Sequence, residues 1–443
     1  MLLSFRVANH RSIRDEQQFN LSPVYETDRP DATAWEAVPV AAVFGANAAG
    51  KSNVIDAFRF MRDMVCFSHR EAEPDGGIER TPFALDAEEE AEPSWYIVDL
   101  LLSGVRYTYG FGVDDDCVVE EWLYSYPRGR RRTVFHRTGD DIEYGEAERP
   151  NRRELDLVME ITEPNSLYIS VAARAKQGSV RPVYDFFRSV ECRPGSRPVP
   201  PSVLSTRMLE DPRWSPSVVE LLRASDLGIE TAGVERFEVN DFGGRVVRRD
   251  PGAVQESLPG IEAEPPTRLG PSARRIRTRV WVEQRGRHGT RRLGLEDQSE
   301  GTRRLFAFAG PVLSALDRGG LLLLDEIDAS LHPRLTAHLI RLFQSSDSNP
   351  RGAQLVLTTH DVSLLGRSGG EDILKRDQIW FVEKDKYGET SLFPLSDFKP
   401  RQEENRERRY LGGSYGAVPV LNDERFAAAV ASRGRMDGEF AGE

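Results

Sequence analysis

The chain has 443 residues and a formal net charge of −12, with 29% charged and 39% hydrophobic residues. This length is enough for two or three domains with separate cores, and the hydrophobic fraction excludes a largely disordered chain. The acidic balance argues against a protein that coats nucleic acid through its overall charge. The three scattered cysteines form no C-x-x-C pair, which excludes a thiolate zinc site, and no apolar run approaches the roughly 20 residues of a membrane span. We therefore expect a soluble, cytoplasmic protein that does not enter a membrane.

Strand patterns surround one helix in the N-terminal third of the chain. Residues 1–25 alternate apolar and polar side chains, which predicts a two-stranded hairpin. Residues 38–44 are a buried strand that enters a glycine-rich loop, and residues 51–68 have the apolar spacing of a helix. Residues 95–137 predict an antiparallel meander with turns at Ser-Gly and Asp-rich positions. The order strand, glycine loop, helix is the one that a phosphate-binding loop needs.

The later elements predict a return to alternating strands and helices after a less regular middle. Residues 150–230 are more helical, with a proline-rich break at 193–201, and residues 245–275 predict a surface loop. No internal repeat or sustained heptad pattern occurs, so we expect no long coiled coil. The remaining predictions are strands at 277–284, 321–325, 354–359, 378–383 and 389–395, helices near 299–317 and 333–345, and a frayed tail from residue 420.

The glycine-rich loop carries the most specific pattern in the chain. Its residues from Gly45 to Ser52 fit G-x-x-x-x-G-K-[ST], in which curled backbone N–H groups and the following helix N-terminus bind phosphate. Lys51 would reach the β- and γ-phosphates of ATP, and the Ser52 hydroxyl would ligate Mg²⁺. The predicted nucleotide contacts of this loop are Gly45, Asn47, Gly50, Lys51, Ser52 and Asn53.

Two later strand ends supply candidate catalytic groups. Four leucines form a strand that delivers Asp325 and Glu326 to the sheet edge. Asp325 would hold the Mg²⁺ shell, and Glu326 would polarise the attacking water. His360 follows the next strand, at a distance of one helix and one strand from Glu326, so we expect it near the γ-phosphate as a sensor. A histidine at a strand end is otherwise an ordinary surface or core residue.

A fourth motif lies where a small-residue turn begins the helix before the acidic strand. Ser299 and Gly301 stand in this turn, and Ser299 could serve only as an N-cap. The four motifs in this order, with the loop 328–333, resemble the ABC-type ATPase heads of the RecF, SMC and OLD-nuclease group. In those heads a Ser-x-Gly turn binds the γ-phosphate held by the opposite subunit. The resemblance implies an ATPase that hydrolyses ATP to ADP and phosphate.

The resemblance is closest to the compact abortive-infection AAA ATPases of RloA type. It runs from residues 7–13, similar to an N-F-R-S-I start with His10 where an aromatic is usual, through 44–53 to the closing pattern 410–419. It implies heads that form a homodimer or higher oligomer around ATP. It also implies a prokaryotic anti-phage defence system, in which the ATPase senses infection and controls a separately encoded effector such as a nuclease or toxin.

The implied fold class is α/β: an ABC-type P-loop ATPase head, in which helices flank a mixed sheet, with an antiparallel β-lobe and a helical insertion. We expect residues 1–149 to form the N-terminal half of the head with the β-lobe, and 150–230 the insertion. Residues 231–420 would form the C-terminal half, and 421–443 a flexible tail.

Several departures and alternatives stand beside this interpretation. The missing coiled coil argues against an SMC-like tether, and the roughly 80 residues after His360 are too few for the Toprim nuclease domain of OLD proteins. Glu383 and Asp385 fit the end of a core strand and its turn better than a nuclease centre. A RecF-like DNA-repair ATPase that clamps DNA directly is the alternative function. Candidate contacts to DNA, RNA or a partner are the arginine clusters 128–132, 274–292 and 401–409, and the pattern 410–419 either docks the effector or closes the core.

Overall fold

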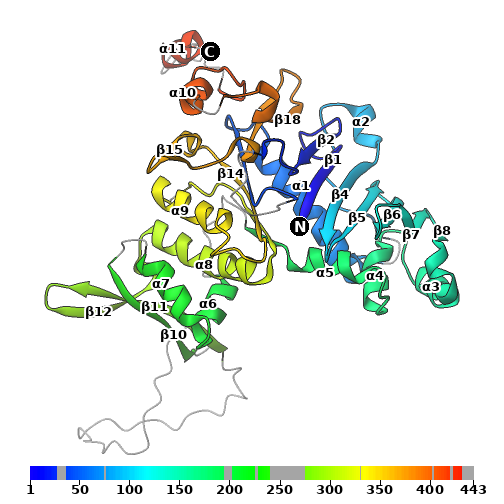
Figure 1. Cartoon of the computed structure of the whole chain (residues 1–443), viewed down its shortest axis with the longest axis horizontal. Coiled ribbons are helices and arrows are strands. Elements are labelled where there is room, and N and C mark those ends of the chain that lie inside the picture. The colour runs from blue at the N-terminus through cyan, green and yellow to red at the C-terminus, as the bar shows by residue number, and fades with distance from the viewer. Residues whose placement is uncertain are drawn as a thin grey trace, which may run out of the picture. The chain divides into compact units, whose positions relative to one another are not determined.

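The computed structural model of the chain describes nine segments, which belong to two compact units (Figure 1). The first unit comprises Met1–Gly195, Gly319–Asp328 and Ala337–Glu443, and the second comprises Ser196–Arg318 and Ala329–Thr336. The loop predicted at 245–275 and the break at 193–201 fall almost entirely outside the described residues. Those described are 1–26, 36–73, 76–193, 202–224, 228–239, 275–329, 331–401, 404–419 and 423–431.

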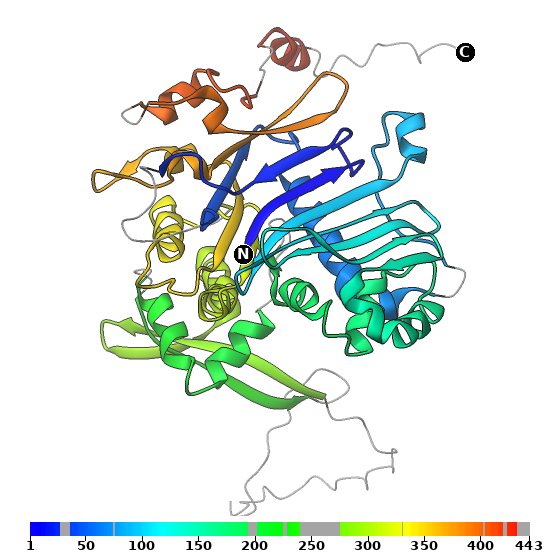
Figure 2. The same ribbon diagram turned by 45° about the vertical axis from the view of Figure 1, so that its right-hand side comes forward.

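A seven-stranded antiparallel sheet forms one layer of the first unit (Figure 2). Its strand order is β2-β1-β4-β5-β6-β7-β8, so the predicted N-terminal hairpin and the predicted meander join in one sheet. Alternation along each strand directs one side chain in two to the core. The strands are β1 (Leu2–Ala8), β2 (Gln17–Asn20), β4 (Ser94–Leu102), β5 (Val105–Val113), β6 (Val118–Tyr126), β7 (Arg132–Thr138) and β8 (Asp141–Tyr144).

A six-stranded mixed sheet, drawn from both ends of the chain, carries the predicted motifs of the first unit. Its order is β18-β17-β3-β14-β13-β9, and all neighbours are parallel except β17 and β18. Every residue of β3, β13 and β14 is buried, as expected for parallel strands covered on both faces. The strands are β3 (Val40–Gly45), β9 (Glu191–Arg193), β13 (Leu321–Leu324), β14 (Gln354–Thr359), β17 (Ile379–Lys384) and β18 (Thr390–Pro394).

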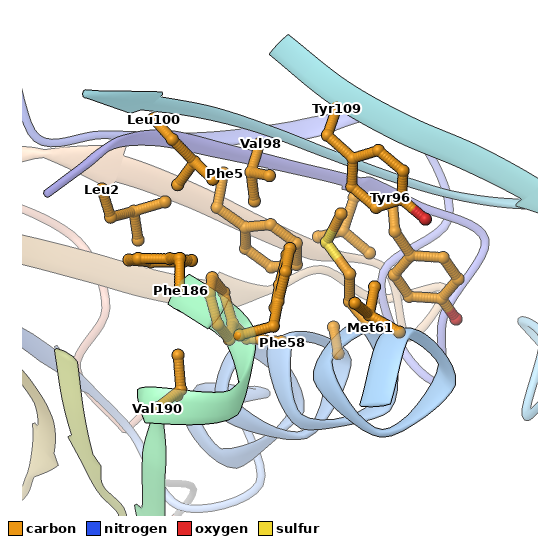
Figure 3. Close-up of a cluster of buried hydrophobic side chains, with 14 of the residues drawn as sticks. Leu2, Phe5, Phe58, Met61, Tyr96, Val98, Leu100, Tyr109, Phe186 and Val190 are labelled. Atoms are coloured by element: carbon orange, nitrogen blue, oxygen red, sulfur yellow. The ribbon is translucent and has the colours of Figure 1, made fainter. Parts of the chain in front are cut away.

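Helix α1 (Lys51–Glu71) packs its apolar face against the seven-stranded sheet (Figure 3). Phe58 meets Phe5 of β1 at a ring distance of 5.1 Å, and Met61 is fully buried in the same cluster. Phe186 and Val190, from the end of α5 (Arg181–Ser189) and just after it, close the cluster from below in this view. The helix that follows the glycine-rich loop is therefore anchored along its length by this core.

The helical segment predicted at 150–230 is divided between the two units. Helices α3 (Arg152–Glu160), α4 (Tyr168–Arg174) and α5 lie in the first unit. The buried Glu121 carboxylate on β6 accepts the backbone N–H groups of Tyr168 and Ile169, at 2.6 and 3.0 Å, and so ties the start of α4 to the sheet. This contact links residues 47 positions apart, so no local pattern in the sequence could indicate it.

The second unit combines a small antiparallel sheet with helices. Its sheet has the order β10-β11-β12, formed by Ile229–Val239, Arg275–Gly286 and Gly289–Gly294. Helix α8 (Glu300–Arg318) packs against α6 (Val203–Glu210) and α7 (Ser215–Arg223). The strand predicted at 277–284 and the helix predicted at 299–317 are confirmed as β11 and α8.

The pattern 410–419 closes the core of the first unit after α10 (Arg406–Leu411). Tyr410 donates its hydroxyl to the Ala417 carbonyl at 3.0 Å, and Tyr410 and Tyr415 both stack on Phe381 of β17. This confirms the structural alternative for the pattern, and its role in docking an effector stays a prediction.

Residues 423–431 of the predicted frayed tail form helix α11 (Asp423–Ala431), in which no residue is buried, and the flexibility of the tail stays a prediction. Alanine is the best helix former, and Asp423 and Glu424 in the first turn complement the helix dipole. Residues 420–422 and 432–443 lie outside the described part. Within the described residues no helix has the length and apolarity to cross a bilayer. The remaining α-helices and strands are α2 (Ala87–Ala91), α9 (Pro333–Gln344), β15 (Arg367–Ser368) and β16 (Glu371–Asp372).

Candidate nucleotide-binding site

A cavity of about 530 Å³ lies at the carboxyl ends of the parallel strands of the first unit. The register of the sheet places Phe44 beside Thr359 of β14 and Gly45 beside Val382 of β17. Loops that leave these strand ends therefore meet at one edge, as is usual for binding sites in parallel sheets. The cavity is lined by Asn47, Ala48, Ala49, Gly50, Lys51, Ser52, Asn53, Glu326, His360 and Lys384.

Two glycines allow the loop between β3 and α1 to take its path. Gly50 has a φ of 107°, and a Cβ added there would collide with the Thr390 side chain. A Cβ at Gly45 would lie 2.5 Å from the Val382 carbonyl oxygen of the neighbouring strand. The glycines of the predicted pattern are thus required by backbone conformation at one position and by close approach at the other.

Lys51 is the first residue of α1, directly after the loop, and is only 5% exposed. Its ammonium donates to the carbonyls of Gly45 and Ala46, both at 2.9 Å, and lies 3.3 Å from His360 Nδ1. Burial lowers the pKa of Lys51 to about 8, against the opposing effect of the acidic residues around it. The lysine is held by backbone dipoles rather than by an ion pair, which leaves its charge available to an anion at the loop.

The Thr358 hydroxyl group hydrogen-bonds to both acidic residues at the end of β13. Asp325 Oδ1 accepts hydrogen bonds from Ser52 Oγ at 3.0 Å and from Thr358 Oγ1 at 2.5 Å. The same Thr358 hydroxyl accepts the backbone N–H of Glu326 at 2.8 Å. Glu326 has a φ of 50°, a left-handed conformation that is rare outside glycine and costs free energy. Its side chain lines the cavity beside the loop.

The structure brings the predicted residues of the first unit together. His360 follows β14, lines the cavity, and has its backbone N–H bonded to Asp328 Oδ2 at 3.1 Å. Asn53 also lines the cavity and donates to Ser12 Oγ at 2.6 Å. The residues that meet here from β3, α1, β13 and β14 are Gly45, Asn47, Gly50, Lys51, Ser52, Asn53, Asp325, Glu326 and His360.

Ser299 and Gly301 lie in the second unit. Ser299 Oγ accepts the backbone N–H of Thr302 at 3.2 Å, which is the hydrogen bond of a helix N-cap at the start of α8. The structural alternative for Ser299 is therefore observed. A contact of Ser299 or Gly301 with nucleotide stays a prediction.

Sequence reasoning missed two hydroxyl groups, those of Ser12 and Thr390, which form hydrogen bonds with the loop and the start of α1. Thr390 of β18 donates to the Ala49 carbonyl at 2.9 Å, and its hydroxyl lies 2.6 Å from Ser12 Oγ. Ser12 and Thr390 are 378 positions apart, so no local pattern could have paired them. Thr358 was missed for the same reason, although it stands two residues before His360.

Lys384 was the fourth residue missed, and a weak signal for it existed. It lies at the end of β17 and lines the cavity on the side of β3 opposite to His360. The chain has only six lysines among 59 basic residues, and two of them, Lys51 and Lys384, line this one cavity. A lysine retained in an arginine-rich sequence is a reason to look at its position.

The prediction that Glu383 and Asp385 form the end of a core strand and its turn is confirmed. Glu383 is an exposed residue of β17, and Asp385 Oδ1 accepts the backbone N–H groups of Tyr387 and Glu389, both at 2.9 Å. Asp385 is thus occupied in shaping the turn before β18. Among the described residues no group of three or more His, Cys, Asp or Glu side chains is arranged to hold a metal ion.

Comparison with known proteins gives a family over most of the chain. A family model described as "AAA domain, putative AbiEii toxin, Type IV TA system" matches residues 40–366. The match includes the Lys51 loop, Ser299, the acidic pair and His360. No curated protein matches the sequence.

Three SMC heads are among the solved structures that the comparison matches to this chain. An SMC head bound to the C-terminal winged-helix domain of ScpA is 13% identical, with 90% of this chain and 99% of that chain covered and a TM-score of 0.43. The SMC head domain from Thermotoga maritima is 14% identical, with coverages of 89% and 98% and a TM-score of 0.39. An SMC head from Pyrococcus furiosus with an extended coiled coil is 12% identical, with coverages of 90% and 97% and a TM-score of 0.35. Identities this low do not bear on activity.

Proposed function

We propose that this chain, which belongs to the AAA-domain family of AbiEii type, binds ATP with Mg²⁺ and hydrolyses it to ADP and phosphate. The observation that carries the proposal is one cavity lined by Lys51 and Ser52 of the loop together with Glu326 and His360 from two other strand ends. No single one of these residues is specific. Their convergence on the carboxyl edge of a parallel sheet is the arrangement that phosphoryl chemistry needs.

The first part of the proposal, nucleotide binding, rests on the loop and the start of α1. Backbone N–H groups of the loop and the N-terminus of α1 create positive potential, and Lys51 adds a buried charge there. Ser52 and Asp325 present a hydroxyl and a carboxylate 3.0 Å apart, which are the hard oxygen ligands that Mg²⁺ prefers. These two residues would hold the ion, which would neutralise negative charge on the phosphates.

The second part of the proposal, catalysis, assigns roles to Glu326 and His360. Glu326 would accept a proton from the attacking water and orient it, since its carboxylate lines the cavity beside the phosphate loop. His360, with Nδ1 at 3.3 Å from Lys51 Nζ, lies where the terminal phosphate of a nucleotide bound to Lys51 would be. It would donate a hydrogen bond to that phosphate and report its loss.

The third part of the proposal concerns the assembly of two heads around nucleotide. Ser299 and Gly301 of one head would close on the nucleotide of another, giving a homodimer or a higher oligomer whose state follows hydrolysis. Their position at the N-terminus of α8, a helix of 19 residues, supports this, since helix N-termini attract phosphate. In this proposal the cycle is that of an anti-phage defence ATPase of RloA type, which controls a separate effector such as a nuclease or toxin.

The first experiment compares ATP binding and hydrolysis in the wild type, Glu326→Gln and a control, Glu383→Gln. Glu383 is an exposed acid near the cavity but outside its lining. We expect Glu326→Gln to bind ATP and to lose hydrolysis by roughly 10²- to 10⁴-fold, the range for a general base. The control should hydrolyse normally. A wild type that fails to bind ATP, or a Glu326→Gln protein with normal turnover, would refute the proposal.

The second experiment addresses the effector and the RecF-like alternative. The chain is purified with its neighbouring gene product, as wild type and as Glu326→Gln, with and without ATP. A stable complex whose stoichiometry or nuclease activity changes with nucleotide supports effector control. A dimer that ignores the neighbour and captures duplex DNA only with ATP supports the repair clamp instead.

A further inference from the structure

Two tryptophans lie on the face of the seven-stranded sheet that is turned away from the core cluster. Trp95 of β4 is paired with Gly112 of β5, and Trp122 of β6 is paired with Gly110. A Cβ added at Gly112 would be 2.6 Å from Trp95 Cζ3, and one at Gly110 would be 2.5 Å from Trp122 Cζ2. Each indole therefore lies on the backbone of the opposite glycine, with its other side directed away from the strand.

Strand alternation fixes which face this is. Tyr109 and Phe111 of β5 are fully buried in the core cluster, so Gly110 and Gly112 between and after them lie on the opposite face. The two indoles are 6.1 Å apart at 39° and both are half-buried. They form a continuous aromatic surface across three neighbouring strands.

The same face continues into a tyrosine and arginine region. Tyr124 and Tyr126 follow on β6, opposite Thr108 and Arg106 of β5. The Arg106 guanidinium lies 5.7 Å from the Tyr126 ring centre, and that of Arg131 lies 4.8 Å from the Tyr124 ring centre. Both arginines place positive charge beside the rings, and the charge of Arg106 is also paired with Asp99 Oδ1 at 3.2 Å.

The turn between β6 and β7, together with the first residue of β7, carries a cluster of positive charge. Four exposed arginines lie here within five positions. None of them forms an ion pair with a described residue, although Arg131 and Arg132 line a cavity together with Glu143 and Glu146. This concentration stands out in a chain whose net charge is −12. The four are Arg128, Arg130, Arg131 and Arg132.

We propose that this face, called here the tryptophan face, binds single-stranded nucleic acid. It consists of Trp95, Trp122, Tyr124, Tyr126 and the arginine turn 128–132. Bases would stack on the indoles, and phosphates would pair with the arginines, which is how sequence-tolerant single-strand sites work. An acidic peptide would use the arginines but not the flat rings. A duplex keeps its bases stacked on one another, so it could use only the charge.

The test measures binding of a fluorescent oligothymidylate of about 20 nucleotides by anisotropy over a salt series. Arg130→Gln/Arg132→Gln is compared with Arg153→Gln/Lys176→Gln, which changes net charge equally at exposed positions outside the tryptophan face. A third variant, Trp122→Leu, keeps an apolar cover over Gly110 but removes the indole. ATP binding by each variant serves as the folding control, since none of these residues lines the nucleotide cavity.

We expect the arginine pair variant to weaken binding by about tenfold and to lower the salt slope by about 1.4, which is about 0.7 for each of the two phosphate contacts, while its control binds as the wild type does. The oligonucleotide should quench wild-type tryptophan fluorescence, and Trp122→Leu should lose affinity and part of the quenching. The proposal is overturned if the wild type shows no binding at low salt, or if the two charge variants are equally impaired. It is also overturned if a duplex or polyglutamate of equal charge competes as well as the single strand does.

Discussion

Thr358 Oγ1 donates a 2.5 Å hydrogen bond to Asp325 Oδ1 across the boundary between β14 and β13. The same oxygen accepts the N–H of the next residue, Glu326, at 2.8 Å. One buried hydroxyl thereby orients a carboxylate proposed to hold Mg²⁺ and stabilises the left-handed backbone of the proposed catalytic base. The proposed roles of Asp325 and Glu326 therefore both depend on Thr358, a residue outside the acidic pair.

Removing this hydroxyl should affect stability and hydrolysis together. Thr358→Val keeps the shape but leaves Asp325 without one partner and the Glu326 N–H without its acceptor. We expect a loss of roughly 1–3 kcal/mol in the free energy of unfolding, the cost of a lost hydrogen bond to a charged group, and a lower ATPase rate. Thr358→Ser retains the oxygen and should restore both. Urea unfolding and steady-state turnover check this, and a Val variant equal to the wild type in both would contradict it.

Lys384 should contribute to nucleotide affinity rather than to turnover. It lines the cavity from β17, whereas His360 comes from β14 on the other side of β3, so we expect Lys384 at the phosphates nearer the nucleoside. Lys384→Gln should then weaken ATP and ADP binding alike, by roughly tenfold or more, as loss of one charged hydrogen bond implies.

The matched control for Lys384 is Lys386→Gln, two residues further along. The Lys386 ammonium lies over the Tyr387 ring at 4.7 Å and is outside the cavity lining. Calorimetric titration with ATP and ADP distinguishes the two lysines. A Lys384 variant that loses ATP affinity but not ADP affinity would place this lysine at the terminal phosphate instead.

Ser299 offers a test that separates helix capping from nucleotide contact. Ser299→Asp keeps a good N-cap and should keep thermal stability, whereas Ser299→Ala should lose about 1 kcal/mol. The aspartate would repel a terminal phosphate, so we expect Ser299→Asp to be stable but deficient in ATP-driven dimerisation and hydrolysis. Light scattering with ATP and thermal unfolding give the two measurements. Normal activity in Ser299→Asp would show that the serine only caps α8.

His10 should make the wild type lose stability in mild acid. It is 2% exposed, with Nδ1 at 2.9 Å from the Tyr96 hydroxyl and Nε2 at 3.3 Å from Asp56. Burial lowers the pKa of His10 below 6.5, although Asp56 opposes this. As the pH falls through 6.5, the unfolded chain takes up a proton that the folded chain does not, so the free energy of unfolding decreases.

The comparison variant for His10 is His10→Phe, which carries no titratable group at this position. Urea midpoints at about pH 7.5 and about pH 5.5 bracket the ordinary histidine pKa. We expect the midpoint to fall more for the wild type than for the variant between these two values. An equal fall in both proteins would mean that other groups account for the acid sensitivity.

The sequence by itself determined the parts of the site that are contiguous in the chain. The loop from Gly45 to Ser52, the strand before it and the helix after it were predictable because turn conformation, burial on both faces and helical spacing leave local patterns. Asp325, Glu326 and His360 were predictable as strand ends, since parallel strands place their carboxyl ends at one edge. Ser299 was correctly placed at a helix start for the same local reason.

The tertiary structure alone decided everything that depends on pairing distant segments. The Ser12 and Thr390 hydroxyls meet over 378 positions, Thr358 reaches Asp325 over 33, and Lys384 enters the cavity through a strand register. The attachment of α4 to the sheet through the buried Glu121, 47 positions away, is likewise a pairing of distant segments. Apolar spacing shows that a residue is buried but not which neighbour it meets, because many registers bury the same side chains. Only the folded chain selects among them, and that selection produced both the nucleotide cavity and the tryptophan face.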